Sequence, residues 1–177
     1  SRHVRAMIKL QGLTGMRPQD VCNLRACDID MSGSIWIYEP PHHKTRWRGH
    51  HRRIPLGPQA QVIIREFLKL ETTAYLFSPK QSEEEPRRAK RDCYDTDSYR
   101  RAIDYGIKKA KKAGVEIPHW FPLQLRHSKG TDVRKRYGWE AAQVALGHKH
   151  AAREVALSLR DRTSKDCVGT DGETIRG

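Results

Sequence analysis

The chain has 177 residues, enough for one domain with its own hydrophobic core. Lysine and arginine number 34 against 21 aspartate and glutamate residues, which gives a formal net charge of +13 at pH 7. Such an excess favours a polyanionic partner and salt-dependent binding, since each neutralised phosphate releases condensed counterions. No apolar run approaches the ~18 residues that a membrane-spanning helix needs, which excludes a membrane protein.

The cysteines give no sign of a metal centre. Four are present, none in a C-x-x-C pair: Cys22, Cys27, Cys93 and Cys167. With no signal peptide in front of them, a reduced cytoplasmic protein is the expectation. The nearest metal-like arrangement joins the first two cysteines to His42, His43, His50 and His51, but its spacing matches no common zinc pattern. We therefore expect no metal and no cofactor.

Two predicted helices meet near residue 17. From Val4, apolar residues recur at helical spacing until Gly15 ends the helix. Pro18 suits the first turn of a second helix that runs to about Leu24. Arg17 therefore lies at the junction, which is a position for an exposed functional side chain.

A small sheet is expected next. A turn over residues 28–33 precedes a predicted strand at 34–38, and a second short strand is predicted at 52–56. The segment 42–51 between them has no acidic residue, so it reads as a basic hairpin. Trp36 and Trp47 are expected to pack in the core or on the hairpin rather than to stack on bases.

The next predicted helix begins at Pro58, and its apolar residues share one face: Val62, Ile63, Phe67 and Leu70. Residues 75–79 close this unit. The charged segment 81–97 is poor in apolar side chains, so we expect a surface loop there.

The last predicted helices cover residues 98–113, 122–137 and 140–146, with Gly138 and Gly147 at helix ends. After about residue 156 the periodicity disappears, which predicts a disordered tail. Taken together, the elements predict an α+β fold that is mainly helical with a small antiparallel β-sheet.

Arg17 and Arg126 are candidates for binding one phosphate, although they are far apart in the sequence. Both stand at predicted helix edges, and arginine donates two parallel hydrogen bonds to phosphate oxygens. His148 stands at another predicted helix end. By residue type alone, each would be an ordinary surface residue of a basic chain.

The surrounding motifs change that interpretation. Four segments, in order and spacing, resemble the catalytic domain of the tyrosine recombinases, also called phage-type integrases: Thr14 to Val21, His43-Lys44-Thr45, Gln124 to Ser128, and Leu146-Gly147-His148. The resemblance runs from about residue 4 to about residue 150. It implies site-specific DNA recombination or integration, as in mobile elements, by strand breakage and rejoining through a phosphotyrosine intermediate without a metal or nucleotide cofactor.

The resemblance also implies a domain organisation and partners. Residues 1–160 would form the tyrosine recombinase catalytic domain, and residues 161–177 the disordered tail. The family's N-terminal DNA-clamping domain is expected to be absent. Double-stranded DNA is the implied partner, with further protomers assembled on it.

Individual roles follow from the same resemblance. Arg17 and Arg126 match the two phosphate-binding arginines, Lys44 the lysine that protonates the leaving 5′-hydroxyl, and His148 the residue that donates to the phosphate near the nucleophile. Two residues are supporting: Asp20 steadies the site, and His127 is the histidine that commonly follows the second arginine. Further contacts with the DNA backbone are expected from Arg46, Arg48, Arg52 and Arg53.

For three of these residues, the residue type alone also fits a role outside catalysis. Lys44 also fits a phosphate-contacting lysine in a solvated hairpin, because general-acid catalysis needs a lowered pKa that a sequence does not reveal. His127 fits a helix residue packed beneath the site. His148 fits a helix-end histidine favoured by the helix dipole.

At two places the chain departs from the family pattern. The histidine usual three residues before the second arginine is replaced by Leu123, an alternative position holds Phe121, and His119 lies at a different helical phase. The nucleophilic tyrosine, expected about nine residues beyond the glycine-histidine pair, corresponds to Leu157. No tyrosine follows Tyr137 in the sequence.

A leucine cannot attack phosphorus. Either another protomer supplies the tyrosine, or the chain is an inactive paralogue or a truncated or frameshifted product that only binds DNA phosphates. Tyr137 is a poor substitute, since it belongs to the preceding helix. A basic RNA-binding or structural protein is a further alternative, but it does not explain the ordered motifs.

Overall fold

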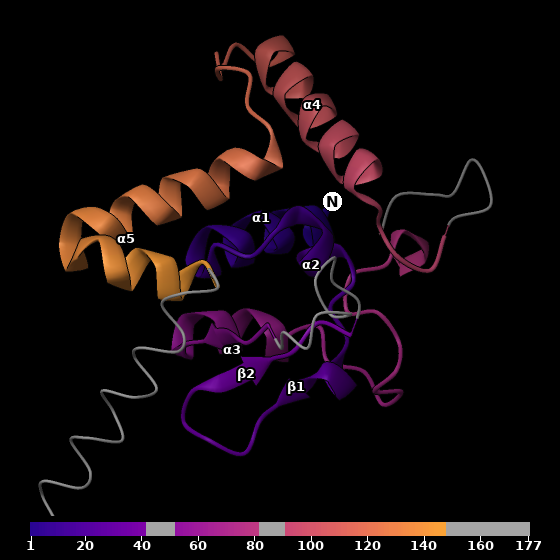
Figure 1. Ribbon diagram of the computed structural model, residues 1–177. Helices are drawn as coiled ribbons and strands as arrows, with labels where there is room; N and C mark the ends of the chain where they lie inside the picture. Colours follow the sequence, from indigo (N-terminus) through magenta and orange to yellow (C-terminus); the bar gives the residue numbers. More distant parts are fainter. Residues whose placement is uncertain (42–51, 82–90, 148–177) are drawn as a thin grey trace, which may run out of the picture.

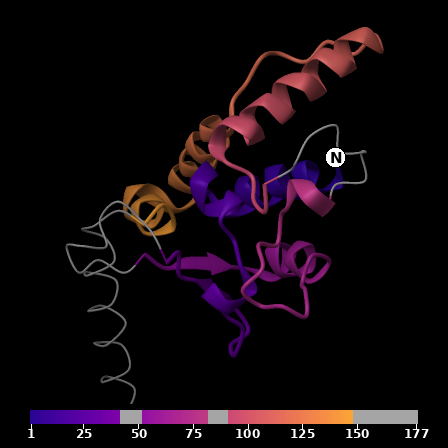
Figure 2. The same ribbon diagram turned by 90° about the vertical axis from the view of Figure 1, so that its right-hand side faces the viewer.

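The computed structural model describes residues 1–41, 52–81 and 91–147. Its helices and strands form three tiers, and the helix α1 (Arg2–Thr14) lies in the middle one. Below it are a small sheet and α3 (Pro58–Arg65), and α4 (Thr96–Lys112) lies above it. Helix α5 (Pro122–Ala145) runs from the upper tier down to the side of α1, as both views show (Figures 1 and 2). No described helix combines the length and the apolar character that crossing a bilayer requires.

Helix α1 is central because nearly all of its faces are covered. It contacts α3 and β3 (Ile54–Leu56) on one side and α4 and α5 on the other. Its buried Gln11 donates to the backbone oxygen of Met16 and accepts a hydrogen bond from the Tyr99 hydroxyl at 3.1 Å. The helix ends as predicted at Gly15, whose φ of 66° is the left-handed conformation that glycine adopts without strain.

The second helix, α2 (Pro18–Cys22), also begins where the sequence predicts. Pro18 occupies its first turn, where no backbone N–H is needed. Arg17 is the N-cap residue, and its backbone N–H donates to Oδ2 of Asp20 at 2.8 Å. The side chain of Asp20 thus closes the first turn and turns inward.

The sheet is antiparallel, with the order β1-β2-β3. After a short 3-10 turn (Ala26–Asp28), β1 (Ile29–Asp30) pairs with β2 (Trp36–Tyr38), which pairs with β3. Strand β1 was predicted as part of a turn, because two residues are too few to leave an alternating pattern. Trp36 is buried as expected, and the Arg65 guanidinium lies over its ring; Trp47 is outside the described residues.

Helix α3 corrects one prediction. It stops at Arg65, and its inner face carries Ala60 and Ile64, followed by Phe67. Val62 is 59% exposed and Leu70 is fully exposed, so the predicted apolar face that included them is wrong. The helix is too short for a periodic pattern to continue to residue 70.

The upper tier follows the predicted pattern closely. Asp95 accepts a hydrogen bond from the Ser98 amide and caps α4, which therefore starts two residues before the predicted position. Gly138, with φ 88° and ψ 177°, interrupts α5 and divides it into two halves, as expected. A 3-10 turn (Pro79–Gln81) is the remaining element, and most of the predicted loop 81–97 lies outside the described residues. The α+β class is confirmed.

Candidate phosphate-binding site

Arg126 is held at the junction of two helix ends. It is buried on α5, where Nη1 donates to the Gly15 oxygen and Nη2 to the Leu146 oxygen, both at 2.7 Å. Gly15 is the C-cap of α1 and Leu146 that of α5, so both acceptors lie where the helix dipole is negative. These bonds bring residues 15 and 126 together and fix the guanidinium.

Arg17 lies just beyond the first of these carbonyls. Its side chain is exposed, and among the described residues no carboxylate forms an ion pair with its guanidinium. The structure therefore presents Arg17 to solvent with its donors available, while Arg126 is braced behind it.

A third arginine belongs to the same cluster. Nη1 of Arg52 lies 2.6 Å from Oδ2 of Asp20, and the two side chains are only 8% and 6% exposed. The contact is an ion pair between two buried side chains. The side chain of Arg52 thus lies beside Asp20 at the candidate site, and its predicted contact with DNA remains a prediction.

The alternation of β3 is a signal that would have located Arg52. Ile54 and Leu56 are buried and Pro55 is exposed. Extending the period of two backwards assigns Arg52 to the inner face and Arg53 to the outer face. Arg53 is indeed exposed, and it pairs with Glu39 at 3.0 Å.

The cluster carries more positive than negative charge. Burial, followed by the charges of Arg52 and then Arg17, lowers the pKa of Arg126 to about 10, although Asp20 opposes this change. Burial likewise lowers the pKa of Arg52, with Asp20 again opposing and Arg17 adding to the effect. The positive charges of neighbouring arginines thus act on both Arg126 and Arg52, beside a single carboxylate. An anion bound among them would relieve the repulsion.

A hollow of about 570 Å³ opens beside Arg17, at the N-terminal ends of α2, α4 and α5. It is lined by Arg17 and by all three positions considered for the missing histidine: His119, Phe121 and Leu123. Nε2 of His119 lies 3.1 Å from Oδ1 of Asp104. The departure at Leu123 therefore leaves an apolar side chain at the edge of the candidate site.

Other predicted residues are placed less centrally or are not described. His127 follows Arg126 on α5 but is exposed, so it does not pack beneath the site. The remaining ones lie outside the described residues: Lys44, Arg46, Arg48, His148 and Leu157. Tyr137 is exposed just before the break at Gly138.

The described residues hold no group of three or more histidine, cysteine or acidic side chains arranged to bind a metal ion. Cys22 is buried in the core whereas Cys27 is exposed. The four histidines of the zinc alternative lie outside the described residues.

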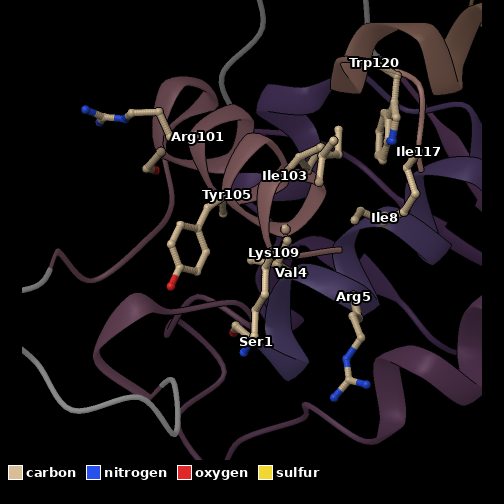
Figure 3. A pocket seen from close by; sticks show the side chains of 14 residues that line it. Ser1, Val4, Arg5, Ile8, Arg101, Ile103, Tyr105, Lys109, Ile117 and Trp120 are labelled. Carbon is tan, nitrogen blue, oxygen red and sulfur yellow. The ribbon is translucent and has the colours of Figure 1, made fainter. Parts of the chain in front are cut away.

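A second cavity lies away from the cluster of Arg17, Arg52 and Arg126. It measures about 810 Å³ and lies between α1 and α4. Figure 3 shows Ile8, Ile103, Ile117 and Trp120 around it, with Arg5 and Arg101 further out. None of the predicted site residues lines this cavity.

A buried arginine held by two backbone carbonyls thus lies beside an exposed arginine on an α+β scaffold. The chain belongs to the phage integrase family, whose sequence profile matches residues 1–154. The predicted resemblance is therefore confirmed. No curated protein matches the sequence significantly.

Solved structures share the fold. The XerH site-specific recombinase bound to its difH substrate is 17% identical, with a TM-score of 0.59 over 92% of this chain and 45% of that one. The Tn1549 transposon integrase in complex with circular intermediate DNA is 17% identical, with a TM-score of 0.60 over 90% and 58%. The XerA recombinase is 20% identical, with a TM-score of 0.52 over 93% and 62%.

These matches confirm the predicted tyrosine recombinase catalytic fold. The chain spans about half the length of the recombinases it matches.

Proposed function

We propose that this chain is the catalytic domain of a site-specific DNA recombinase and binds the backbone phosphate at which a strand is broken and rejoined. The observation that carries the proposal is the meeting of exposed Arg17 with buried Arg126, from segments more than a hundred residues apart. The net charge of +13 supports double-stranded DNA as the partner. The proposed setting is the cytoplasm of the cell, with further protomers on the DNA.

The arginines would act on charge that develops during the reaction. A phosphodiester under attack gathers negative charge on its non-bridging oxygens, and donors fixed in advance stabilise that charge without reorganising. The Arg126 guanidinium has five N–H groups and donates hydrogen bonds to the carbonyls of Gly15 and Leu146. Its other N–H groups can donate to a phosphate. The guanidinium of Arg17 would donate a second pair of hydrogen bonds to the phosphate oxygens.

Lys44 and His148 are proposed to complete this site. Lys44 would protonate the leaving 5′-hydroxyl, and His148 would donate to the phosphate. Both roles rest on the sequence motifs, together with Asp20 and His127 as supporting residues.

The nucleophile sets a limit on the proposed activity. The position expected to hold the tyrosine is Leu157, so we propose that this chain orients the phosphate but does not form the covalent link with its own side chain. The second candidate function, favoured by the same leucine, is a DNA-binding module without chemistry.

A DNA substrate that traps covalent intermediates separates these functions. We expect no adduct on a denaturing gel from the chain alone, and an adduct when it is mixed on one DNA with a relative that keeps its tyrosine but has lost its own phosphate-binding arginines and forms no adduct by itself. No adduct in either case, with DNA binding intact, would leave the binding module as the function. An adduct from the chain alone that Tyr137→Phe abolishes would assign Tyr137 as nucleophile.

The phosphate site itself is tested by Arg17→Ala. We expect this variant to weaken binding to duplex DNA at low salt, whereas Arg134→Ala, an exposed arginine over the Trp139 ring, serves as the matched control. Equal effects of the two substitutions would show that DNA is bound by diffuse positive charge and not at this site.

A further inference from the structure

We propose that Arg52 is a positioning residue of the phosphate site, which holds Arg17 and the end of α5 in fixed relation without contacting DNA. This inference rests on the proposed function, because phosphate binding is what the positioning serves. It replaces the expectation that Arg52 is a hairpin contact with the DNA backbone.

One carboxylate oxygen connects Arg52 to Arg17. Oδ2 of Asp20 accepts the backbone N–H of Arg17 at 2.8 Å and lies 2.6 Å from Nη1 of Arg52. Because Arg52 and Asp20 are both more than nine-tenths buried, neither side chain swings out to solvent at little cost. The start of β3 is thereby tied to the N-cap residue of α2.

The stem of Arg52 supports the other half of the site. A Cβ at Gly147 would lie 3.6 Å from Nε and 3.7 Å from Cγ of Arg52, so the side chain is in contact range of the end of α5. The preceding residue, Leu146, gives its carbonyl to Arg126. Arg52 therefore lies beside both segments whose separation sets the distance between Arg17 and Arg126.

The electrostatics fit an internal role. Asp20 offsets the charge of Arg52, and the buried pair adds little field for DNA, while Arg17 and Arg126 keep their excess charge for an anion. A buried ion pair stabilises a fold only weakly compared with apolar side chains, but it specifies one arrangement, because removing either partner leaves the other charge buried and unpaired.

Arg53 provides a matched control in the next position. It has the same charge and directly follows Arg52 in the chain, but it is exposed on the opposite face and pairs with Glu39. A residue that only adds to the basic surface should behave like Arg53.

The test is a double-mutant cycle read by the affinity for a fluorescent mixed-sequence DNA duplex at several salt concentrations. Arg52→Gln should weaken binding about tenfold in the wild-type background and less than about twofold when Arg17→Ala is already present. Arg53→Gln should have the same small effect in both backgrounds. Since Arg52 makes no phosphate contact, Arg52→Gln in the Arg17→Ala background should leave the slope of log K against log salt unchanged.

Additive losses, with a slope reduced by about one contact, would overturn the proposal and make Arg52 a direct DNA ligand. If Arg17→Ala alone leaves the affinity unchanged, the proposed function fails and not merely the positioning. Should Arg52→Gln fail to fold, Arg52→Lys enters the cycle: it keeps the charge beside Asp20 but loses the fork, so a smaller and still non-additive loss is expected.

A second readout separates positioning from general stability. Inorganic phosphate, titrated into the folded protein, should shift the arginine Nε–H signals of Arg17 and Arg126 in NMR spectra. In Arg52→Lys the Arg17 shift should shrink at a temperature where the variant is fully folded. An unchanged shift would contradict a positioning role.

Discussion

At the scale of single residues, Arg126 combines an anchoring and a binding role. Its two charge-assisted bonds to backbone carbonyls join α1 to α5, whereas the lowered pKa records that the same guanidinium is buried near other cations. The two hydrogen bonds stabilise the fold, whereas repulsion between Arg126 and the neighbouring arginines destabilises it. The net balance is measurable by substitution.

We expect Arg126→Ala to lower the free energy of unfolding by about 2–4 kcal/mol, because two buried carbonyls lose a charged donor. Arg126→Lys should recover only part of this, since one ammonium does not reach both carbonyls in the same geometry. Lys135→Ala, at an exposed position on the same helix, is the control. Urea denaturation measures all three, and a loss no larger than that of the control would mean that the two bonds add nothing net.

Cys22 gives a prediction for alkaline pH. Burial is the largest cause that raises the pKa of its thiol from 9.0 to about 12. Between these values the unfolded chain has lost a proton that the native chain keeps, so stability falls as the pH rises from 9 towards 12, by up to about 1.4 kcal/mol per pH unit for this group. Burial also raises the pKa of Tyr38 and Tyr99, which adds to the fall above pH 10.

Cys22→Ala should therefore show a shallower decline of unfolding free energy between pH 8.5 and about 10 than the wild type, whatever its stability at neutral pH. Cys27→Ala, at an exposed position, should leave the slope unchanged. Parallel slopes for wild type and Cys22→Ala would contradict the assignment of a protonated, buried thiol.

At the scale of elements, two glycines allow α1 and α5 to approach through Leu146. A Cβ at Gly130 would lie 2.8 Å from Cδ1 of Leu146, and one at Gly15 would lie 3.2 Å from its Cδ2. The leucine side chain is thus confined between the two glycines. The end of α5, with the carbonyl that Arg126 binds, is seated by this packing.

Gly130→Ala should destabilise the protein by about 1 kcal/mol, because the cost of overpacking exceeds the gain in helix propensity. Gly106→Ala, in α4 with no atom within 4 Å of the added Cβ, should instead stabilise it by about 0.5–1 kcal/mol. Thermal unfolding compares the pair. Adding Leu146→Ala to Gly130→Ala should remove the steric part of the loss, and strict additivity of the two substitutions would argue against the contact.

The elements show why some features were predictable from the sequence. The start of α2 at Pro18, the end of α1 at Gly15 and the break at Gly138 are set by local backbone chemistry, which a sequence displays directly. Strand β1 and the early end of α3 depend on pairing and packing with distant segments, so local patterns miss them.

The same distinction applies to the site. Motifs pointed to Arg17 and Arg126, but the carbonyls that brace Arg126 belong to helix ends that come together only in the folded chain. Arg52 was predicted as a DNA contact on the basic hairpin, whereas its side chain is 8% exposed and lies beside Asp20. The alternation that assigns it to the inner face spans only three residues of β3.

At the scale of the whole molecule, three positive charges and one negative charge meet where Arg17, Arg52 and Arg126 surround Asp20. The lowered pKa of Arg126 means that the charged form of this side chain is less favourable in the folded protein than in the unfolded chain. A doubly charged anion in this place would offset that cost in the native state and would have no equivalent site in the unfolded chain. Binding to the native state alone raises stability by mass action.

Sulfate should therefore raise the midpoint of thermal unfolding relative to chloride at equal ionic strength. The free energy of unfolding rises by about 2.7 kcal/mol when the sulfate concentration is a hundred times the dissociation constant of sulfate. Arg17→Ala should remove most of this rise, because the exposed fork is lost while the fold keeps the bonds of Arg126. Arg53→Gln, which changes the net charge equally on the outer face of β3, should retain it. The same gain in both variants would mean that sulfate acts through general screening or exclusion from the surface. A gain that depends on Arg17 locates anion binding at the arginine cluster independently of any DNA sequence.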